Sequence, residues 1–297
     1  MRSWMKAEVT PFDLWEVETT TFENGGFLFP DGKDKVCKES HMKQHNIQEV
    51  EGGGWKMVKP MLNYFGFGHS ERAGLGVEKG RTKSRFMNNM LYTTEGMKKL
   101  AFSHAPLVSD VMETISVGEL DKDPLVISTD HKCNAVGQAR FTDKRISELI
   151  FLNVPSWGGG ALPWEWSRNL GIAGEADSRY AANGLENVGA SVGDGKIEVL
   201  SWSSRFGLSV NIANSKFWTP GRGRSRRVHQ GKGPYTLDFK GKDQAIYKKE
   251  GRVYAQIDGE FYVMTRPKQV VIRHKQTIRV LTCRGEPYGK SRGCCGA

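Results

Sequence analysis

Short apolar runs separated by glycine-rich turns dominate the pattern of hydrophobic and polar positions along the chain. Apolar and polar residues alternate in Lys196-Ile197-Glu198-Val199 and again from Arg252 to Ile257. A period of two is typical of a strand with one face on a core and one in water. The pattern predicts strands at 13–20, 148–154, 196–202, 206–212, 252–257, 260–264, 268–273 and 277–282.

Helical spacing of apolar residues is confined to two segments, 80–102 and 106–117. Three stretches rich in polar residues or glycine predict loops or insertions, at 22–54, 156–195 and 219–235. Strands far outnumber helices in this reading, so we expect a β-rich α+β fold.

Composition and charge bear on the partners and the cellular compartment of the protein. The chain of 297 residues carries a formal charge of +10, which fits an anionic partner but fits a merely soluble basic surface better. Its 5 cysteines form no Cys-x-x-Cys pair, which favours a reducing compartment. No apolar run is long enough to span a membrane, and the first residues show no apolar signal core. We therefore expect a cytoplasmic protein without a transmembrane segment.

The sharpest candidate for chemistry is Asp258-Gly259-Glu260, which lies between two apolar strands. Asp-Gly is a strong signal for a type I′ hairpin turn, so solvated acids at a tight turn are the simplest interpretation. The functional interpretation is that one carboxylate at the strand tip accepts a proton or binds Mg²⁺. Spacing alone favours the turn.

A second candidate is the basic stretch 219–235, whose members suited to phosphate or to an acidic membrane surface are Arg222, Arg224, Arg226, Arg227 and Lys232. The plainer interpretation is a charged loop in solvent. A nucleic-acid partner is disfavoured, because the stretch has one aromatic residue and no recognisable binding fold.

Several segments, taken in order, resemble the accessory domain of eukaryotic diacylglycerol kinases. Asp13-Leu14-Trp15 is similar to the family's Asp-x-Trp strand, and 63–68 (NYFGFG) to its Asn-Tyr-Phe segment. The other similar segments are 81–92, 151–160 (FLNVPSWGGG), 194–199 (DGKIEV), 224–231 (RSRRVHQG), 256–260 (QIDGE) and 272–275 (IRHK). The resemblance covers about residues 10–283 with an insertion near 22–54, so we expect the domain at 1–283 and a disordered tail at 284–297.

The resemblance implies a two-layer β-sandwich-like lobe with one or two packed helices. It also implies a lipid kinase that phosphorylates diacylglycerol with ATP and Mg²⁺ to give phosphatidic acid, at the surface of an anionic membrane. In such an enzyme Glu260 is the first candidate for proton acceptance or for organising Mg²⁺, and Asp258 is the second. The basic residues of 222–232 would then face phosphates or the membrane.

Two departures from the family pattern bear on activity. The Gly-x-Asp-Ala after the Asn-Tyr-Phe segment reads Gly68-His69-Ser70-Glu71, so Ser70 replaces a carboxylate and weakens a charge or metal contact there. No segment resembles the family's Gly-Gly-Asp-Gly-Thr loop, which binds the nucleotide. We therefore expect a kinase that works with an upstream or separate nucleotide-binding lobe. The alternative is a non-catalytic lipid-surface or assembly module that retains the accessory fold.

Overall fold

The structure is a computed structural model, and it describes residues 7–29, 39–80, 107–118, 123–127, 146–157, 162–168, 188–202, 225–241 and 252–283. The strands are β1 (Ala7–Leu28), β2 (Ile47–Glu49), β3 (Trp55–Met61), β4 (Tyr64–Gly68), β5 (Met112–Val117), β6 (Asp123–Ile127), β7 (Glu148–Leu152), β8 (Ile197–Trp202), β9 (Ser225–Gly231), β10 (Tyr235–Phe239), β11 (Arg252–Ile257) and β12 (Glu260–Cys283). The helices among the described residues are α1 (Glu39–Gln44), α2 (His69–Gly80), α4 (Val108–Val111) and α5 (Pro163–Arg168).

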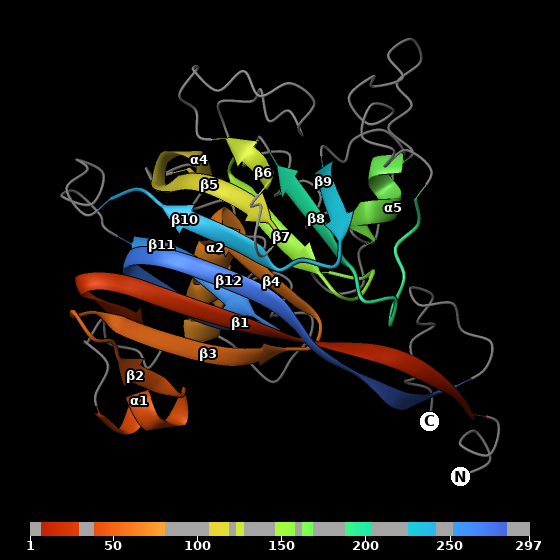
Figure 1. Cartoon of the computed structure of the whole chain (residues 1–297), viewed down its shortest axis with the longest axis horizontal. Coiled ribbons are helices and arrows are strands. Elements are labelled where there is room, and N and C mark those ends of the chain that lie inside the picture. Colours follow the sequence, from red (N-terminus) through yellow and green to blue (C-terminus); the bar gives the residue numbers. More distant parts are fainter. Residues whose placement is uncertain are drawn as a thin grey trace.

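One branched antiparallel sheet contains all twelve strands (Figure 1). Its main path runs β2-β3-β1-β12-β11-β4-β7-β8-β9, and a second branch runs from β12 through β10 and β5 to β6. β12 is the branch point, because its residues 260–265 pair with β11 whereas 269–272 pair with β10. Arg266 has a φ of 47° between these two stretches, so the strand bends where it changes partner.

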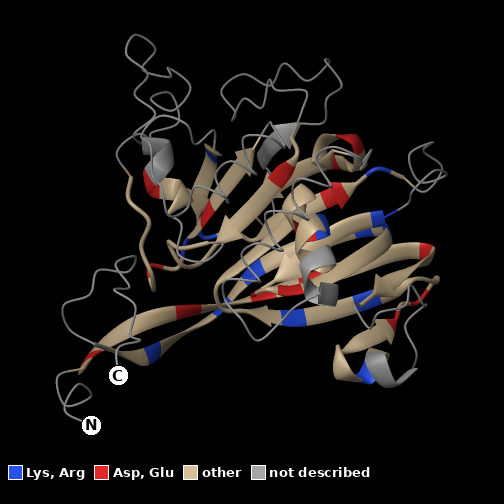
Figure 2. Cartoon of the chain, turned by 180° about the vertical axis from the view of Figure 1, so that it is seen from behind, with Lys and Arg blue, Asp and Glu red and all other residues tan. Residues whose placement is uncertain are grey.

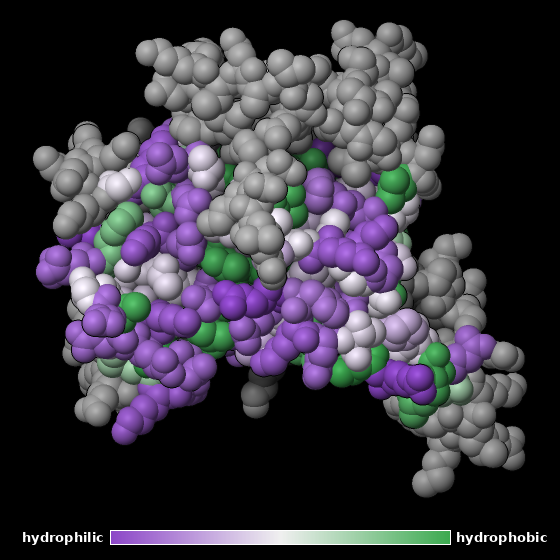
Figure 3. All heavy atoms as spheres, viewed as in Figure 1, coloured by the Kyte–Doolittle hydropathy of each residue, from purple (hydrophilic) through white to green (hydrophobic). Residues whose placement is uncertain are grey.

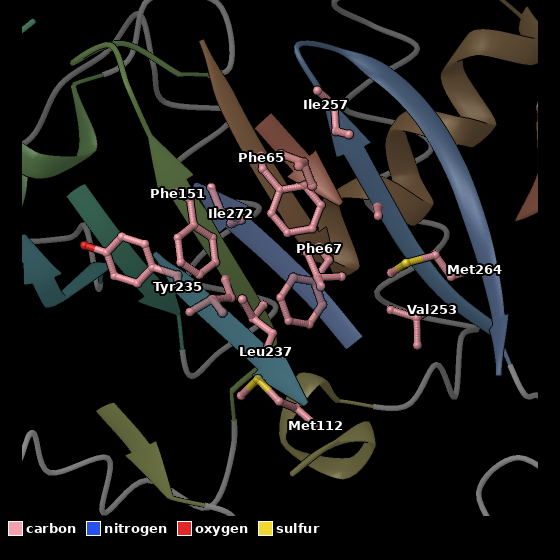
Figure 4. Close-up of a cluster of buried hydrophobic side chains, with 14 of the residues drawn as sticks. Phe65, Phe67, Met112, Phe151, Tyr235, Leu237, Val253, Ile257, Met264 and Ile272 are labelled. Carbon is pink, nitrogen blue, oxygen red and sulfur yellow. The ribbon is translucent and has the colours of Figure 1, made fainter. Parts of the chain in front are cut away.

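The two branches fold over each other and enclose the main hydrophobic core (Figure 4). Phe151 of β7 lies with its ring centroid 5.5 Å from that of Tyr235 on β10, and Phe67 of β4 lies 5.8 Å from Phe239 on the same strand. Centroid distances of this size are typical of packed aromatic pairs in a protein core. The fold is therefore β-rich and sandwich-like, as the sequence predicts.

The outer face of the β7–β8 pair is buried as well. Every residue of both strands is buried, and a second cluster contains Ile150, Leu152, Leu200 and Trp202 on that face. Trp164 of α5 packs into this cluster. A helix thus covers one outer face, and α2 contacts β4, β11 and β12 elsewhere.

Most of the strand predictions are confirmed, with longer elements than expected. The segments 260–264, 268–273 and 277–282 form the single strand β12, and 13–20 lies within β1. The reason is that β1 and β12 pair along nearly their whole length, and bulges absorb their irregularities. The predicted strand 206–212 and tail 284–297, and the helix 80–102 apart from Gly80, lie outside the described residues.

Three expectations about local structure are wrong. Of the expected helix 106–117, residues 108–111 form the short helix α4 and 112–117 form β5, because Ile115 and Leu237 pair across β5 and β10 in the sheet. The expected loop 219–235 contains strand β9, which pairs with β8. The described part of 22–54, expected as a loop or an insertion, includes the end of β1, α1 and β2, so it is not a loop throughout. At β5 and β9 pairing between strands overrides local pattern.

The ends of β1 and β12 extend together from the body as a two-stranded ribbon (Figure 1). Val9 and Leu281 face each other in this pair and are exposed by 62% and 59%. Elsewhere hydrophilic side chains cover most of the described surface in the view of Figure 3. Basic and acidic residues are interspersed over the described strands, as Figure 2 shows.

Candidate functional site

Asp258 and Gly259 form the two-residue turn between β11 and β12. Both have positive φ, 52° and 87°, and Ile257 pairs with Glu260 across the turn. Positive φ at both central positions is the requirement of a type I′ turn, so the predicted hairpin is confirmed. The turn fixes the backbone from which Glu260 projects.

The Asp258 carboxylate binds the neighbouring turn between β3 and β4. It accepts backbone N–H bonds from Leu62 at 2.7 Å, Asn63 at 2.7 Å and Tyr64 at 3.0 Å, while the Asp258 N–H donates to the Tyr64 carbonyl at 3.0 Å. Three donors occupy most of the acceptor capacity of a carboxylate. Asp258, the second candidate for catalysis, therefore joins two turns in this structure.

Glu260 is more open than Asp258. Its side chain is 69% exposed and forms an ion pair with the Lys59 ammonium. The hydrogen bond from Lys59 holds the pKa of Glu260 below its usual range, with smaller contributions from the charges of Lys59 and His45. Glu260 is therefore an exposed, ionised carboxylate, the form that binds a cation or accepts a proton.

Asn153 connects the Asp258 turn to β1. Its amide nitrogen donates to the carbonyls of Asp13 at 2.8 Å and Leu62 at 2.5 Å, and its amide oxygen accepts from the Trp15 indole at 2.9 Å. Its backbone N–H donates to the Asn63 carbonyl at 2.8 Å. Because Asn153 is buried, these bonds hold the 62–64 turn against the body of the sheet.

The Asp13 carboxylate, also buried, extends this network. It accepts from the Thr277 hydroxyl at 2.6 Å and the Gly195 N–H at 2.7 Å, and His274 Nε2 lies 3.0 Å away. Burial alone would raise the pKa of Asp13, but these hydrogen bonds outweigh it and hold the pKa below the usual value. Segments that resemble the family one by one, far apart in sequence, thus meet in one hydrogen-bonded network.

The basic candidates do not gather in the same way. Arg222 and Arg224 lie outside the described residues, as does the side chain of Arg226, whose backbone is in β9. Lys232 is exposed after β9. Arg227, expected at the surface, is instead only 5% exposed: its guanidinium lies 4.4 Å from the Trp164 ring centroid and donates to the carbonyls of Trp164 and Val188. Its role is packing α5 onto the sheet.

A buried pair of carboxyl groups, Glu71 and Glu148, escaped the sequence analysis. Ser70 donates its N–H to Glu148 at 2.9 Å and its hydroxyl bonds the same carboxyl, while Gln256 donates to Glu71 at 2.8 Å. Burial raises the pKa of Glu71, and burial together with the charge of Glu71 raises that of Glu148. Both shifts favour the protonated form of the carboxyl group, most strongly at Glu148.

The Glu71–Glu148 pair compensates for the absence of a carboxylate at Ser70. The family's carboxylate is missing at that position, but Glu148 brings a carboxyl group to the Ser70 backbone from β7. Gly68 makes room for it, since a Cβ there would lie 2.8 Å from a Glu148 oxygen. The available sequence signal was a glutamate directly before the apolar run of 149–152.

Glu198 is a second buried carboxyl group that the sequence analysis did not single out. Gln230 donates to it at 2.9 Å and also donates to the Gly189 carbonyl at 2.9 Å. Burial raises the pKa of Glu198 to about 8. These bonds tie β8 and β9 to the segment before β8, within the resemblance at 194–199.

The residues present suit a magnesium ion only in part. The described ranges contain no group of three or more His, Cys, Asp and Glu side chains that could hold a metal. Mg²⁺ in phosphoryl-transfer sites is commonly held by one or two carboxylates plus substrate phosphates. Glu260 therefore fits as one ligand of a nucleotide-bound ion, and no protein cage surrounds that position in the described part.

Among the described residues, no helix is long and apolar enough to cross a membrane.

Comparison with known proteins identifies the family of the chain. No curated protein matches the chain. The family model described as "Diacylglycerol kinase accessory domain" matches residues 60–261, which include the Asn63 turn, Asn153, Glu198 and the Asp258-Gly259-Glu260 turn. The chain belongs to the diacylglycerol kinase accessory domain family.

Proposed function

We propose that the chain is the accessory part of a lipid kinase that transfers the terminal phosphoryl group of ATP to the free hydroxyl of diacylglycerol. The product is phosphatidic acid. The observation that supports this best is the turn at Asp258–Glu260, where a fixed backbone presents one exposed carboxylate. Family membership supports the choice of reaction.

In the proposed step Glu260 accepts the proton of the diacylglycerol hydroxyl. The hydroxyl oxygen forms a bond to the γ-phosphorus, the bond between that phosphorus and the β–γ bridging oxygen breaks, and ADP leaves. A Mg²⁺ ion bound with the nucleotide would neutralise phosphate charge. The work of Asp258 is positioning, because its three backbone bonds keep the turn beside residues 62–64.

The proposed reaction requires two partners, a nucleotide-binding lobe and a membrane. The nucleotide is expected on a lobe carrying the Gly-Gly-Asp-Gly-Thr loop, either upstream in the same protein or separate. Diacylglycerol lies in membranes, so the protein is expected to act peripherally at anionic bilayers from the cytoplasmic side. Exposed cations such as Lys232 would contribute about 1 kcal/mol each near such a surface.

The test is transfer of labelled phosphate from ATP to diacylglycerol in mixed micelles by the full transcript product, which includes any nucleotide lobe encoded upstream. We expect Glu260→Gln to lower kcat by about 10²-fold or more. Glu18→Gln is the matched control, because Glu18 also forms ion pairs on a strand but lies away from the turn. Wild-type kcat in Glu260→Gln would remove Glu260 from the mechanism.

A non-catalytic lipid-surface module is the second candidate. It is favoured by one observation: Glu260 already has a cationic partner, and its lowered pKa makes it a weak proton acceptor. Sedimentation with anionic vesicles at low salt distinguishes the two functions. A module requires vesicle binding by a transfer-inactive protein; failure to bind either vesicles or a protein partner would contradict it.

A further inference from the structure

Lys59 is the cation at the candidate site. It lies in the middle of β3, where its backbone pairs with Val17 of β1. Its side chain is only 12% exposed, yet it reaches the Glu260 carboxylate across the gap between β3 and the β11–β12 turn. An ammonium group with this little exposure is stabilised by a nearby counter-charge.

The two members of this ion pair differ in freedom. Glu260 is 69% exposed and follows a turn, so its side chain can move into solvent at little cost. Lys59 stays where the sheet holds it, and departure of Glu260 would leave its charge without a partner. The site is therefore poised to take another anion in place of the Glu260 carboxylate.

Residues outside the family match lie beside the Lys59 ammonium. The Phe29 ring lies 5.7 Å from the Lys59 ammonium and stacks on His45 with ring centroids 3.6 Å apart. The match begins at residue 60, so Phe29, His45 and Lys59 all precede it. A cation over an aromatic face gains further stabilisation.

We propose that Lys59 binds the terminal phosphate group of a reactant or product, exchanging its ion pair with Glu260 for phosphate oxygens. This inference rests on the proposed function, and it assigns a binding residue to the same site. When phosphate takes Lys59, Glu260 is released toward the acceptor hydroxyl. Phe29 and His45, which lie beside Lys59, precede the residues that match the family. This part of the site is therefore a feature of this chain outside the family match.

Two terminal phosphate groups satisfy this chemistry, the γ-phosphate of ATP before transfer and the monoester headgroup of phosphatidic acid after it. Both carry oxygens that accept charge-assisted hydrogen bonds from an ammonium group. Separate titrations with ATP, inorganic phosphate and short-chain phosphatidic acid distinguish them. A preference for ATP assigns Lys59 to the donor side, and a preference for the lipid assigns it to the product side.

The experiment follows backbone amide shifts of residues 59 and 259–260 by NMR during each titration of the full protein. We expect Lys59→Met to weaken phosphate binding by about fivefold or more, the loss of one ion pair. Lys56→Met is the control, since Lys56 lies on the same strand and pairs with Glu18 at 3.1 Å instead. Lys59→Arg retains the charge and should retain binding, which separates loss of the anion site from loss of the fold.

Glu260→Gln gives the most discriminating result, because it removes the anion that competes for Lys59. We expect it to bind phosphate about three- to tenfold more tightly than the wild type. Unchanged or weaker binding in Glu260→Gln, wild-type binding in Lys59→Met, or no shift with any of the three anions at millimolar concentrations overturns the proposal. If Glu260→Gln binds phosphate more tightly and transfers phosphate as well as the wild type, Lys59 is supported as the phosphate-binding residue and Glu260 is rejected as the base.

Discussion

The open turn at Asp258–Glu260 and the buried pair Glu71–Glu148 use the same chemical group in opposite ways. Glu260 is exposed by 69%, and its pKa is lowered by a hydrogen bond from Lys59. Glu71 and Glu148 are fully buried, and burial raises the pKa of both. Side-chain type says little about charge until the surroundings are known.

The strand β11 and its turn connect the two regions. Gln256 donates to Glu71 in the interior, while Asp258 accepts from the 62–64 turn at the surface. One short segment therefore serves a buried polar cluster and an open site. The comparison predicts that changes near Glu71 act on stability, whereas changes at Glu260 act on chemistry.

The largest effect is expected from adding one methyl group beside the buried pair. A Cβ at Gly68 would lie 2.4 Å from the Ser147 carbonyl oxygen, and the φ of this residue is 142°. We expect Gly68→Ala to lower the free energy of unfolding by about 3 kcal/mol or more, through strain and overlap. Urea denaturation followed by circular dichroism measures it.

Gly259→Ala is the matched substitution at the open turn. Its φ is 87°, but a Cβ there would meet no atom within 4 Å. Only backbone strain remains, so the expected loss is about 1–2 kcal/mol. Equal losses at the two glycines would mean that the buried side is no more tightly packed than the turn.

The next effect concerns the three backbone bonds of Asp258. Asp258→Ala leaves the N–H groups of Leu62, Asn63 and Tyr64 without their acceptor, and we expect a loss of about 2–3 kcal/mol in the free energy of unfolding. Asp258→Asn retains one acceptor oxygen and should lose about half as much. If the alanine variant is as stable as the wild type, Asp258 does not join the turns.

Local sequence patterns predicted the parts of this molecule that depend on neighbours in the chain. The type I′ turn at Asp258-Gly259 follows from the φ that those residues tolerate, and β11 follows from its alternating residues. The segment 106–117 has an apolar spacing that suits a helix, yet β10 pairs with it as a strand. Pairing between distant segments is invisible to periodicity.

The candidate site shows the same division. Glu260 could be singled out because its turn has a recognisable motif, but Lys59 lies on another strand and became its partner only through the fold. Arg227 looked like a surface cation in a basic run, and only the structure places Trp164 against it. The contact between Glu71 and Glu148 could not be predicted either, because α2 and β7 are far apart in sequence and only the fold brings them together.

The response of stability to pH also distinguishes the two regions. Above pH 4.5, the usual glutamate pKa, the unfolded chain releases its glutamate protons, whereas burial raises the pKa of Glu71 and Glu148 and favours proton retention in the folded chain. Raising the pH toward the raised native pKa therefore removes stability, by at most about 1.4 kcal/mol per pH unit. Glu71→Gln removes one buried carboxyl group and the charge that helps to raise the pKa of Glu148, so its unfolding free energy should fall less steeply with pH.

Guanidinium unfolding between pH 5 and pH 9 tests this slope. Glu198, whose pKa burial raises to about 8, acts in the same direction and leaves a residual slope in the variant. Glu113→Gln changes an exposed glutamate on β5 and should follow the wild type. Parallel curves for Glu71→Gln and wild type would show that Glu71 contributes nothing to the pH dependence of stability.

The smallest effect on stability is expected at Glu260, where the effect on chemistry should be greatest. An ion pair with one exposed member contributes about 0–1 kcal/mol, because water screens the charge and the long side chains lose freedom. We expect Glu260→Gln to change the free energy of unfolding by about 0.5 kcal/mol or less. A double-mutant cycle with Lys59→Met measures the coupling, and a coupling above about 2 kcal/mol would contradict the idea that Glu260 leaves Lys59 easily. A small coupling together with lost phosphoryl transfer would show that the open turn, unlike the buried pair, is built for exchange of partners.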